Sequence, residues 1–192
     1  MLKKWLLAAL IPATLIAQEN LVSLNLNNTD LEVEYEKNQP AGASSRLYYG
    51  VGALNAEDEF EKTNVMLSGY VSIMGLTPVP GLAASIGFKG VTAAVDVGGE
   101  DLTVMALPVR IGVLYTLPLV VRSHVAGFVA YAPKSLALSD CESYTETRLE
   151  AIVEPMEGGM IVLGWRNMQF KPDGGGTYEF NRSGYLGVKM LF

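Results

Sequence analysis

The chain has 192 residues, of which 49% are hydrophobic and 18% are charged, and its formal net charge is −6. This length suits a single domain, and the charged fraction is low against the roughly 25% of a typical soluble domain. The negative charge argues against nucleic-acid binding, which needs a basic face, and no apolar run long enough for a transmembrane helix follows the N-terminal segment.

The N-terminal segment predicts a secretory signal peptide. Two lysines precede an apolar stretch from Trp5 to Ile16, and Ala17 is a small residue at which a signal peptidase could cut. We therefore predict a signal peptide at 1–17 and one exported barrel domain at 18–192. A short membrane anchor is the alternative, although the apolar stretch is too short to span a bilayer comfortably.

The hydrophobic pattern of the rest of the chain has period two, which is typical of β-strands. In "LEVEYEK", Leu31, Val33 and Tyr35 alternate with glutamates. We predict an all-β fold, an antiparallel up-and-down transmembrane β-barrel of ten strands, near 21–27, 31–37, 46–55, 64–75, 82–93, 102–115, 121–131, 143–154, 160–170 and 184–192. The first two are about seven residues long, short of the 9–11 of a tilted membrane strand, so eight strands plus an N-terminal hairpin is the alternative.

The connections between these strands alternate in character along the chain. Short, proline-bearing connections such as "LTPVPG", "TLPLV" and "EPMEGG" alternate with more polar and mostly longer ones such as "NAEDEFEKTN", "PKSLALSDCES" and "KPDGGGTYEFNR". Outer-membrane barrels have tight periplasmic turns and longer external loops. The alternation therefore favours such a barrel over a soluble sandwich.

The two faces of the later strands differ in polarity. In "VMALPVRIGVLY", Leu107, Val109 and Ile111 share one face, and Arg110 lies on the other. A membrane barrel points its apolar face outward to lipid and its polar face inward, whereas a soluble barrel does the reverse. For a membrane barrel, we predict these charges to face the lumen: Lys89, Arg110, Glu146, Arg148, Glu150, Arg166 and Lys189. Such a network would either fill the barrel or line a narrow channel.

The C-terminal sequence "SGYLGVKMLF" predicts the signal that the barrel-assembly machinery reads in outer-membrane proteins. The residues of this signal are Tyr185, Gly187, Met190 and the terminal Phe192. We expect the side chain of Phe192 to face lipid at the periplasmic rim. A soluble edge strand that happens to end in phenylalanine is the alternative.

Several segments resemble the YfaZ-like outer-membrane protein family over about residues 20–192. The resemblance rests on "SRLYYGVGAL", on "YAP" at 131–133, on "SYTETRLEA" and on "GWRNMQF". It implies an outer-membrane β-barrel and supplies no functional residues to carry over.

The sequence offers little for catalysis or for metal binding. His124 is the only histidine, and the adjacent Ser123 would point to the opposite face of a strand. Cys141 is the only cysteine, so it has no internal partner, and we expect an idle loop thiol. We predict no catalytic residues, no metal site and no cofactor.

These observations predict a non-enzymatic, porin-like barrel in the outer membrane of a Gram-negative cell envelope, with a structural or narrow-channel role. The expected partners are outer-membrane lipids, the barrel-assembly machinery, the secretion system and a small solute, but no nucleic acid. The alternatives are a soluble exported lipocalin-like barrel that binds a small apolar ligand and an outer-membrane enzyme that modifies lipid.

Overall fold

The computed structural model describes residues 20–57, 63–97 and 100–192, so the predicted signal peptide lies outside the described residues. The strands are β1 (Asn20–Leu26), β2 (Leu31–Pro40), β3 (Ser45–Glu57), β4 (Thr63–Leu76), β5 (Leu82–Val97), β6 (Glu100–Ala106), β7 (Val109–Leu117), β8 (Arg122–Ala132), β9 (Ala137–Ser139), β10 (Cys141–Met156), β11 (Gly159–Pro172) and β12 (Tyr178–Leu191). Among the described residues, no helix has the length and apolar character needed to cross a membrane.

The strands form one closed antiparallel barrel. β1 pairs with both β2 and β12, and β4 pairs with β5, which completes the ring. β6 and β7 both pair with β5 and occupy one position in the wall, and the short β9 extends the position of β8 by pairing with β6. The wall therefore has ten strand positions, which confirms the predicted number. The alternative of eight strands plus a hairpin is wrong, because β1 is hydrogen-bonded on both sides despite its 7 residues.

A proline interrupts the strand predicted at 102–115. Pro108 separates β6 from β7, since a proline has no backbone N–H to donate to a ladder. Its carbonyl still accepts a hydrogen bond from the backbone N–H of Lys89 at 2.9 Å, while Leu107 donates to the Leu136 carbonyl at 2.8 Å. The apolar alternation continues across the break and hides it in the sequence. Other differences from prediction include the start of β12 at Tyr178 rather than at 184 and the short β9 within an expected loop.

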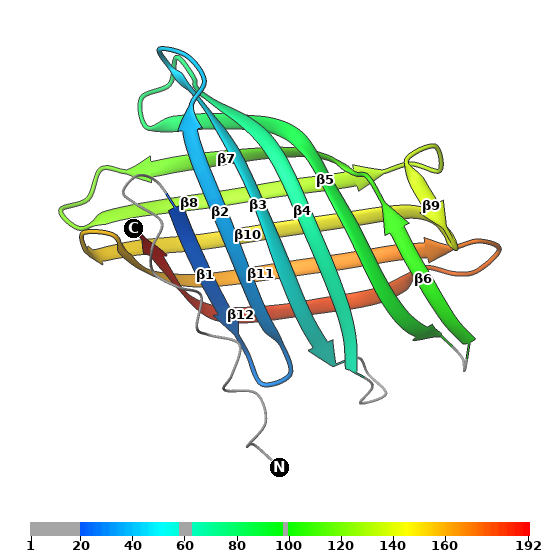
Figure 1. Ribbon diagram of the computed structural model, residues 1–192. Coiled ribbons are helices and arrows are strands. Elements are labelled where there is room, and N and C mark those ends of the chain that lie inside the picture. The colour runs from blue at the N-terminus through cyan, green and yellow to red at the C-terminus, as the bar shows by residue number, and fades with distance from the viewer. Residues whose placement is uncertain (1–19, 58–62, 98–99) are drawn as a thin grey trace.

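The barrel is flattened, with β1–β5 crossing in front of the layer formed by β7, β8 and β10–β12 (Figure 1). One end of the barrel carries the first residue of β1, the chain end at Phe192 and the connections at 41–44, 77–81, 118–121 and 157–158; we call it the terminal end. The opposite end carries the described connections at 27–30, 133–140 and 173–177, and is called the loop end. The connections within "LTPVPG", "TLPLV" and "EPMEGG" thus share one end.

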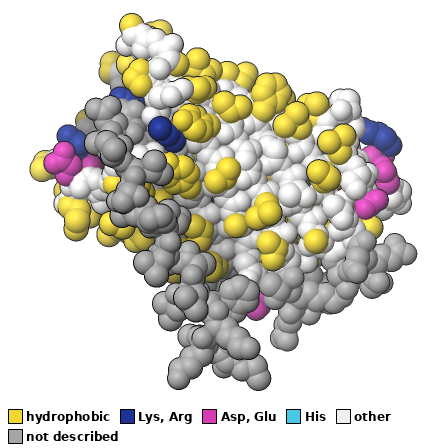
Figure 2. Space-filling view, viewed as in Figure 1, with side chains coloured by type: hydrophobic (Ala, Val, Ile, Leu, Met, Phe, Trp, Pro, Cys, Tyr) yellow, Lys and Arg dark blue, Asp and Glu magenta, His cyan; other side chains and the backbone are white. Residues whose placement is uncertain are grey.

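Hydrophobic side chains cover the outer wall. Leu107 and Ile111 are 43% and 58% exposed, whereas Glu150 in the interior is 8% exposed. Figure 2 shows hydrophobic groups spread over the visible wall, with the visible charged groups mainly near its two ends. This is the reverse of a water-soluble barrel, so the lipocalin-like alternative is wrong.

On β11, the apolar side chains of the outer wall stop before the strand reaches the loop end of the barrel. The outward side chains of Ile161, Leu163 and Trp165 are apolar, and the next two in the same direction are Asn167 and Gln169. β11 therefore has an apolar segment toward the terminal end and a polar extension toward the loop end. A strand that passes through a bilayer and continues beyond it has this pattern.

Apolar side chains also fill the interior at the loop end. We call this group the apolar layer, and its buried members are Leu54, Ala56, Met66, Val91, Ala93, Val95, Val104, Ala106, Ala132, Ala137, Cys141, Tyr144, Met168, Phe170 and Phe180. Cys141 is therefore not in a loop as predicted: it starts β10, and its thiol is buried in this layer and donates to the Ser143 carbonyl at 3.2 Å.

Candidate functional site: the barrel lumen

The inward side chains of β10 mark three levels in the lumen. Tyr144 belongs to the apolar layer, Glu146, Arg148 and Glu150 form a charged level, and Ile152 lies toward the terminal end. Successive inward positions of a strand are two residues apart, so this order follows from the sequence. The lumen thus changes from apolar to charged to mixed along its axis.

Arg166, like Glu146, is one of the fully buried charges of the lumen. Its Nε donates to Asn181 at 2.7 Å, its Nη1 to Glu32 at 2.9 Å and its Nη2 to Asp30 at 2.9 Å. These partners come from β12, β2 and the β1–β2 turn. One guanidinium therefore ties three separate parts of the wall together, with the planar fork of donors that suits carboxylates.

Asp30 accepts hydrogen bonds from several directions in the turn before β2. Ser183 and Asn27 donate to it at 2.6 Å each, and Asn181 and Arg166 donate at 2.9 Å each. Burial opposes ionisation of this carboxyl, but these four donors together hold the pKa of Asp30 below its usual value. Asp30 therefore carries a negative charge that Arg166 balances.

The other central charges are also paired. Arg148 binds Glu32 at 2.6 Å, and Lys89 binds Glu146 at 2.6 Å. Both pairs lie inside the barrel with little solvent exposure, so the pairing offsets part of the cost of removing each charge from water. The Tyr144 hydroxyl donates to Glu146 at 3.0 Å and connects the charged level to the apolar layer.

A third pair lies nearer the terminal end. Lys189 binds Glu150 at 2.5 Å, and the Tyr185 hydroxyl donates to Glu150 at 2.7 Å. The Tyr185 ring lies directly over Gly164, where a Cβ would approach the ring to 2.1 Å. A glycine is therefore needed at 164 for this ring to reach the lumen.

Arg110 differs from the other lumen cations. Its guanidinium carbon lies 4.5 Å from the centre of the Tyr70 ring and 4.1 Å from that of the Phe128 ring. Within the described part of the chain, Arg110 has no ion pair and no hydrogen bond, and its Nε is buried without a partner. Nearby, the Glu36 carboxylate accepts a hydrogen bond from the Tyr70 hydroxyl.

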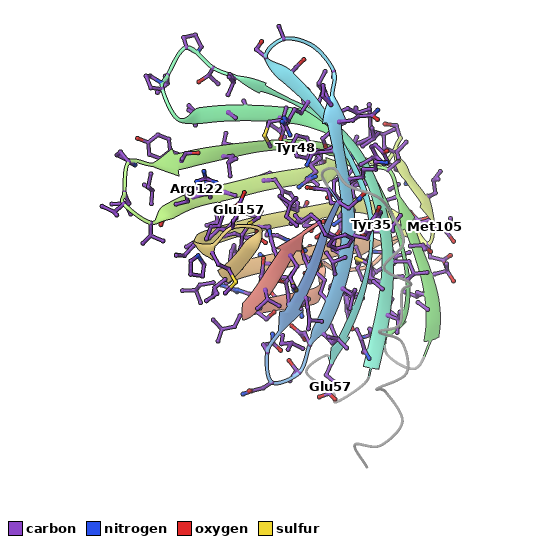
Figure 3. All side chains as sticks on the ribbon, turned by 60° about the vertical axis from the view of Figure 1, so that its left-hand side comes forward. Tyr35, Tyr48, Glu57, Met105, Arg122 and Glu157 are labelled. Atoms are coloured by element: carbon purple, nitrogen blue, oxygen red, sulfur yellow. The ribbon has the colours of Figure 1, made fainter. Side chains whose placement is uncertain are left out.

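A cavity of about 310 Å³ lies on the terminal side of the charged level. Arg110, Lys189 and His124 line it, together with Glu34 and Glu36 of β2. None of the buried residues of the apolar layer lines it. Figure 3 shows Arg122 and Glu157 at the terminal end, with Met105 on the outer wall and side chains filling the space between the walls.

The structure places all seven of the charged residues singled out in the sequence inside the barrel. Lys89, Glu146, Arg148 and Arg166 are joined by ion pairs into one group through Glu32; Glu150 and Lys189 form a second, and Arg110 lies apart. The participants that were missed include Asp30, Glu32 and Asn181. Glu32 alternates with Leu31 and Val33, so its inward direction was available from the sequence. Asp30 lies in a turn and Asn181 in an expected loop, where no periodicity applies.

The residues of the predicted assembly signal lie on both faces of β12. Met190 and Phe192 are 63% and 53% exposed on the outside, whereas Tyr185 and Gly187 are buried inside. The backbone of Phe192 exchanges two hydrogen bonds with Asn20, at 2.9 and 3.1 Å, and so helps to close the barrel. Recognition of this end by an assembly machinery stays a prediction.

His124 lies near the terminal end of β8, and its Nδ1 is 3.1 Å from the Thr116 hydroxyl. The adjacent Ser123 hydroxyl donates instead to the Val121 carbonyl at 3.0 Å. In the described ranges no group of three or more potential metal ligands occurs. That the protein has no enzymatic activity, metal or cofactor stays a prediction.

Solved outer-membrane proteins have a similar fold. The outer membrane channel DcaP of Acinetobacter baumannii matches with a TM-score of 0.43 and 10% identity, over 90% of this chain and 72% of that one. The NanC porin matches with a TM-score of 0.44 and 9% identity, over 92% of this chain and 99% of that one. The closed antiparallel barrel itself is established by the strand pairing described above.

Comparison with protein families adds no assignment. No family model matches the chain, and a search of curated proteins finds no match either. The YfaZ-like resemblance therefore stays a prediction.

Proposed function

We propose that the protein is an integral outer-membrane barrel whose lumen is closed in this conformation, with a structural rather than an open-pore role in the envelope. The apolar wall meets lipid, and the terminal end faces the periplasm because the longest described connection, 133–140, lies at the opposite end. The exported chain is inserted by the barrel-assembly machinery, which reads the end of β12.

The observation that carries the closed-barrel proposal is the sequence of levels in the lumen. Starting at the terminal end, a solute meets the cavity, then the paired charges around Arg148 and Arg166, then the apolar layer. The ion pairs are short and buried, so opening the charged level would leave charges without partners. A barrel of about ten strands is narrow enough for side chains to fill it.

Conductance of the refolded protein in a planar bilayer tests this proposal. We expect no steady current of the kind that a porin gives, because the described side chains occupy the lumen. A known open porin in the same bilayer is the positive control. Heat-dependent gel mobility and retention in carbonate-washed vesicles must show that the protein is folded and inserted. A steady current from this inserted protein would contradict the closed barrel and favour the narrow channel.

A further inference from the structure

Among the lysine and arginine side chains that line the cavity, Arg110 is the one that makes no ion pair with a described residue, although Glu36 lines the same cavity. The other lysine and arginine side chains that line it, Lys89, Arg148 and Lys189, each have a carboxylate oxygen at 2.5 or 2.6 Å. Arg110 instead has an aromatic ring within 4.5 Å of its guanidinium carbon on two sides. Stacking stabilises the cation but does not use its in-plane N–H groups, of which the Nε–H is buried without a partner.

The two rings also fix the direction of the guanidinium. Tyr70 comes from β4 and Phe128 from β8, so two parts of the wall hold the group between them. A guanidinium held in place loses little side-chain freedom when it binds a planar anion. Its planar fork matches the two oxygens of a carboxylate.

We propose that the cavity is a binding site for a small monocarboxylate with a short alkyl chain, which enters from the terminal end and binds Arg110 through its carboxylate. Apolar side chains of Leu114, Ile152 and Met160 line the same cavity and would contact the alkyl chain. Glu34 and Glu36 also line it, and their charges disfavour a dianion such as phosphate. The volume of about 310 Å³ admits a small solute rather than a lipid.

The proposed binding site goes beyond the closed-barrel proposal and does not depend on it. The cavity lies on the terminal side of the charged level, so a solute can bind there whether or not the barrel conducts ions. A steady current would therefore contradict the closed-barrel proposal, and the binding site would still have to be tested separately. The chemistry of the ligand follows from Arg110 and its neighbours alone.

Saturation-transfer NMR titrations of the refolded protein with pentanoate, pentylamine and inorganic phosphate test the site. We expect saturable binding of pentanoate and at least about tenfold weaker binding of the other two probes, because only pentanoate supplies one planar anion and an alkyl chain. This comparison uses the unmodified protein, so it does not depend on the folding of a variant. Equal binding of pentylamine and pentanoate, or no saturable binding of pentanoate, would overturn the proposal.

Arg110→Gln is the matching variant, and Arg182→Gln is its control. Arg182 has a side chain that is 61% exposed in β12 near the loop end, far along the strand from the cavity-lining Lys189. Loss of a charged hydrogen-bond donor should weaken pentanoate binding about ten- to hundredfold in Arg110→Gln, and Arg182→Gln should bind as the parent does. If Arg110→Gln shows the heat-dependent mobility of the parent and retains its affinity, Arg110 is not the binding group.

Discussion

Replacing Arg166 with glutamine is expected to lower the free energy of unfolding of the refolded barrel by about 3–5 kcal/mol. The fully buried guanidinium binds Asp30 and Glu32, each at 2.9 Å, and its loss leaves both carboxylates with less compensation inside the lumen. Urea unfolding in lipid vesicles, followed by gel mobility and far-ultraviolet circular dichroism, measures the change.

Two further variants separate this effect from the mere loss of an arginine. Arg182→Gln removes an arginine that is 61% exposed and lies 3.8 Å from Glu179, and we expect a change below about 1 kcal/mol. Adding Asp30→Asn to Arg166→Gln removes one of the uncompensated carboxylates and should restore part of the lost stability. An Arg166→Gln variant as stable as Arg182→Gln would show that the buried cluster is not needed.

Arginine in place of Leu163 is expected to destabilise the barrel in a bilayer by about 2–4 kcal/mol. Leu163 is 62% exposed on the outer wall, in the middle of the apolar segment of β11. In water, a charge at so exposed a position would change stability by no more than about 0.5 kcal/mol. In lipid, the same side chain must leave the hydrocarbon or remain poorly solvated.

Gln169→Arg is the matched control, because it lies on the same strand and points in the same direction. It belongs to the polar extension of β11, where we expect a cost of at most about 1 kcal/mol. The same unfolding assay compares both variants. Equal small effects at 163 and 169 would argue that no bilayer surrounds the apolar segment.

Period-two alternation carried most of the fold prediction. Inward and outward positions of β10 could be read directly from Glu146, Arg148 and Glu150, because each strand residue points opposite to its neighbour. The break at Pro108 was missed, since apolar residues keep the same alternation on both sides of it. The apolar layer was also missed, because only charged residues were assigned to the lumen, although Phe170 lies on the same face of β11 as Arg166.

The pairing of the charges could not be predicted from their direction. Arg166 and Asp30 are 136 positions apart in the chain and meet only because β12 closes against β1. The isolation of Arg110 has the same origin. It faces inward like Arg148, yet the rings of Tyr70 and Phe128 surround it where a carboxylate would otherwise lie. Closure and packing, rather than periodicity, determine which charges find partners.

Spin-label accessibility along β7 tests the outward direction of the apolar face most directly. Single cysteines at Val109, Arg110, Ile111 and Val113, in a Cys141→Ser background, would carry the label in vesicles. Oxygen concentrates in lipid, whereas a polar nickel complex stays in water. We expect labels at 109, 111 and 113 to collide more often with oxygen than with the nickel complex. We expect the label at 110 not to show this preference for oxygen. Labels at 109, 111 and 113 that meet the nickel complex more often than oxygen would contradict a lipid-facing wall.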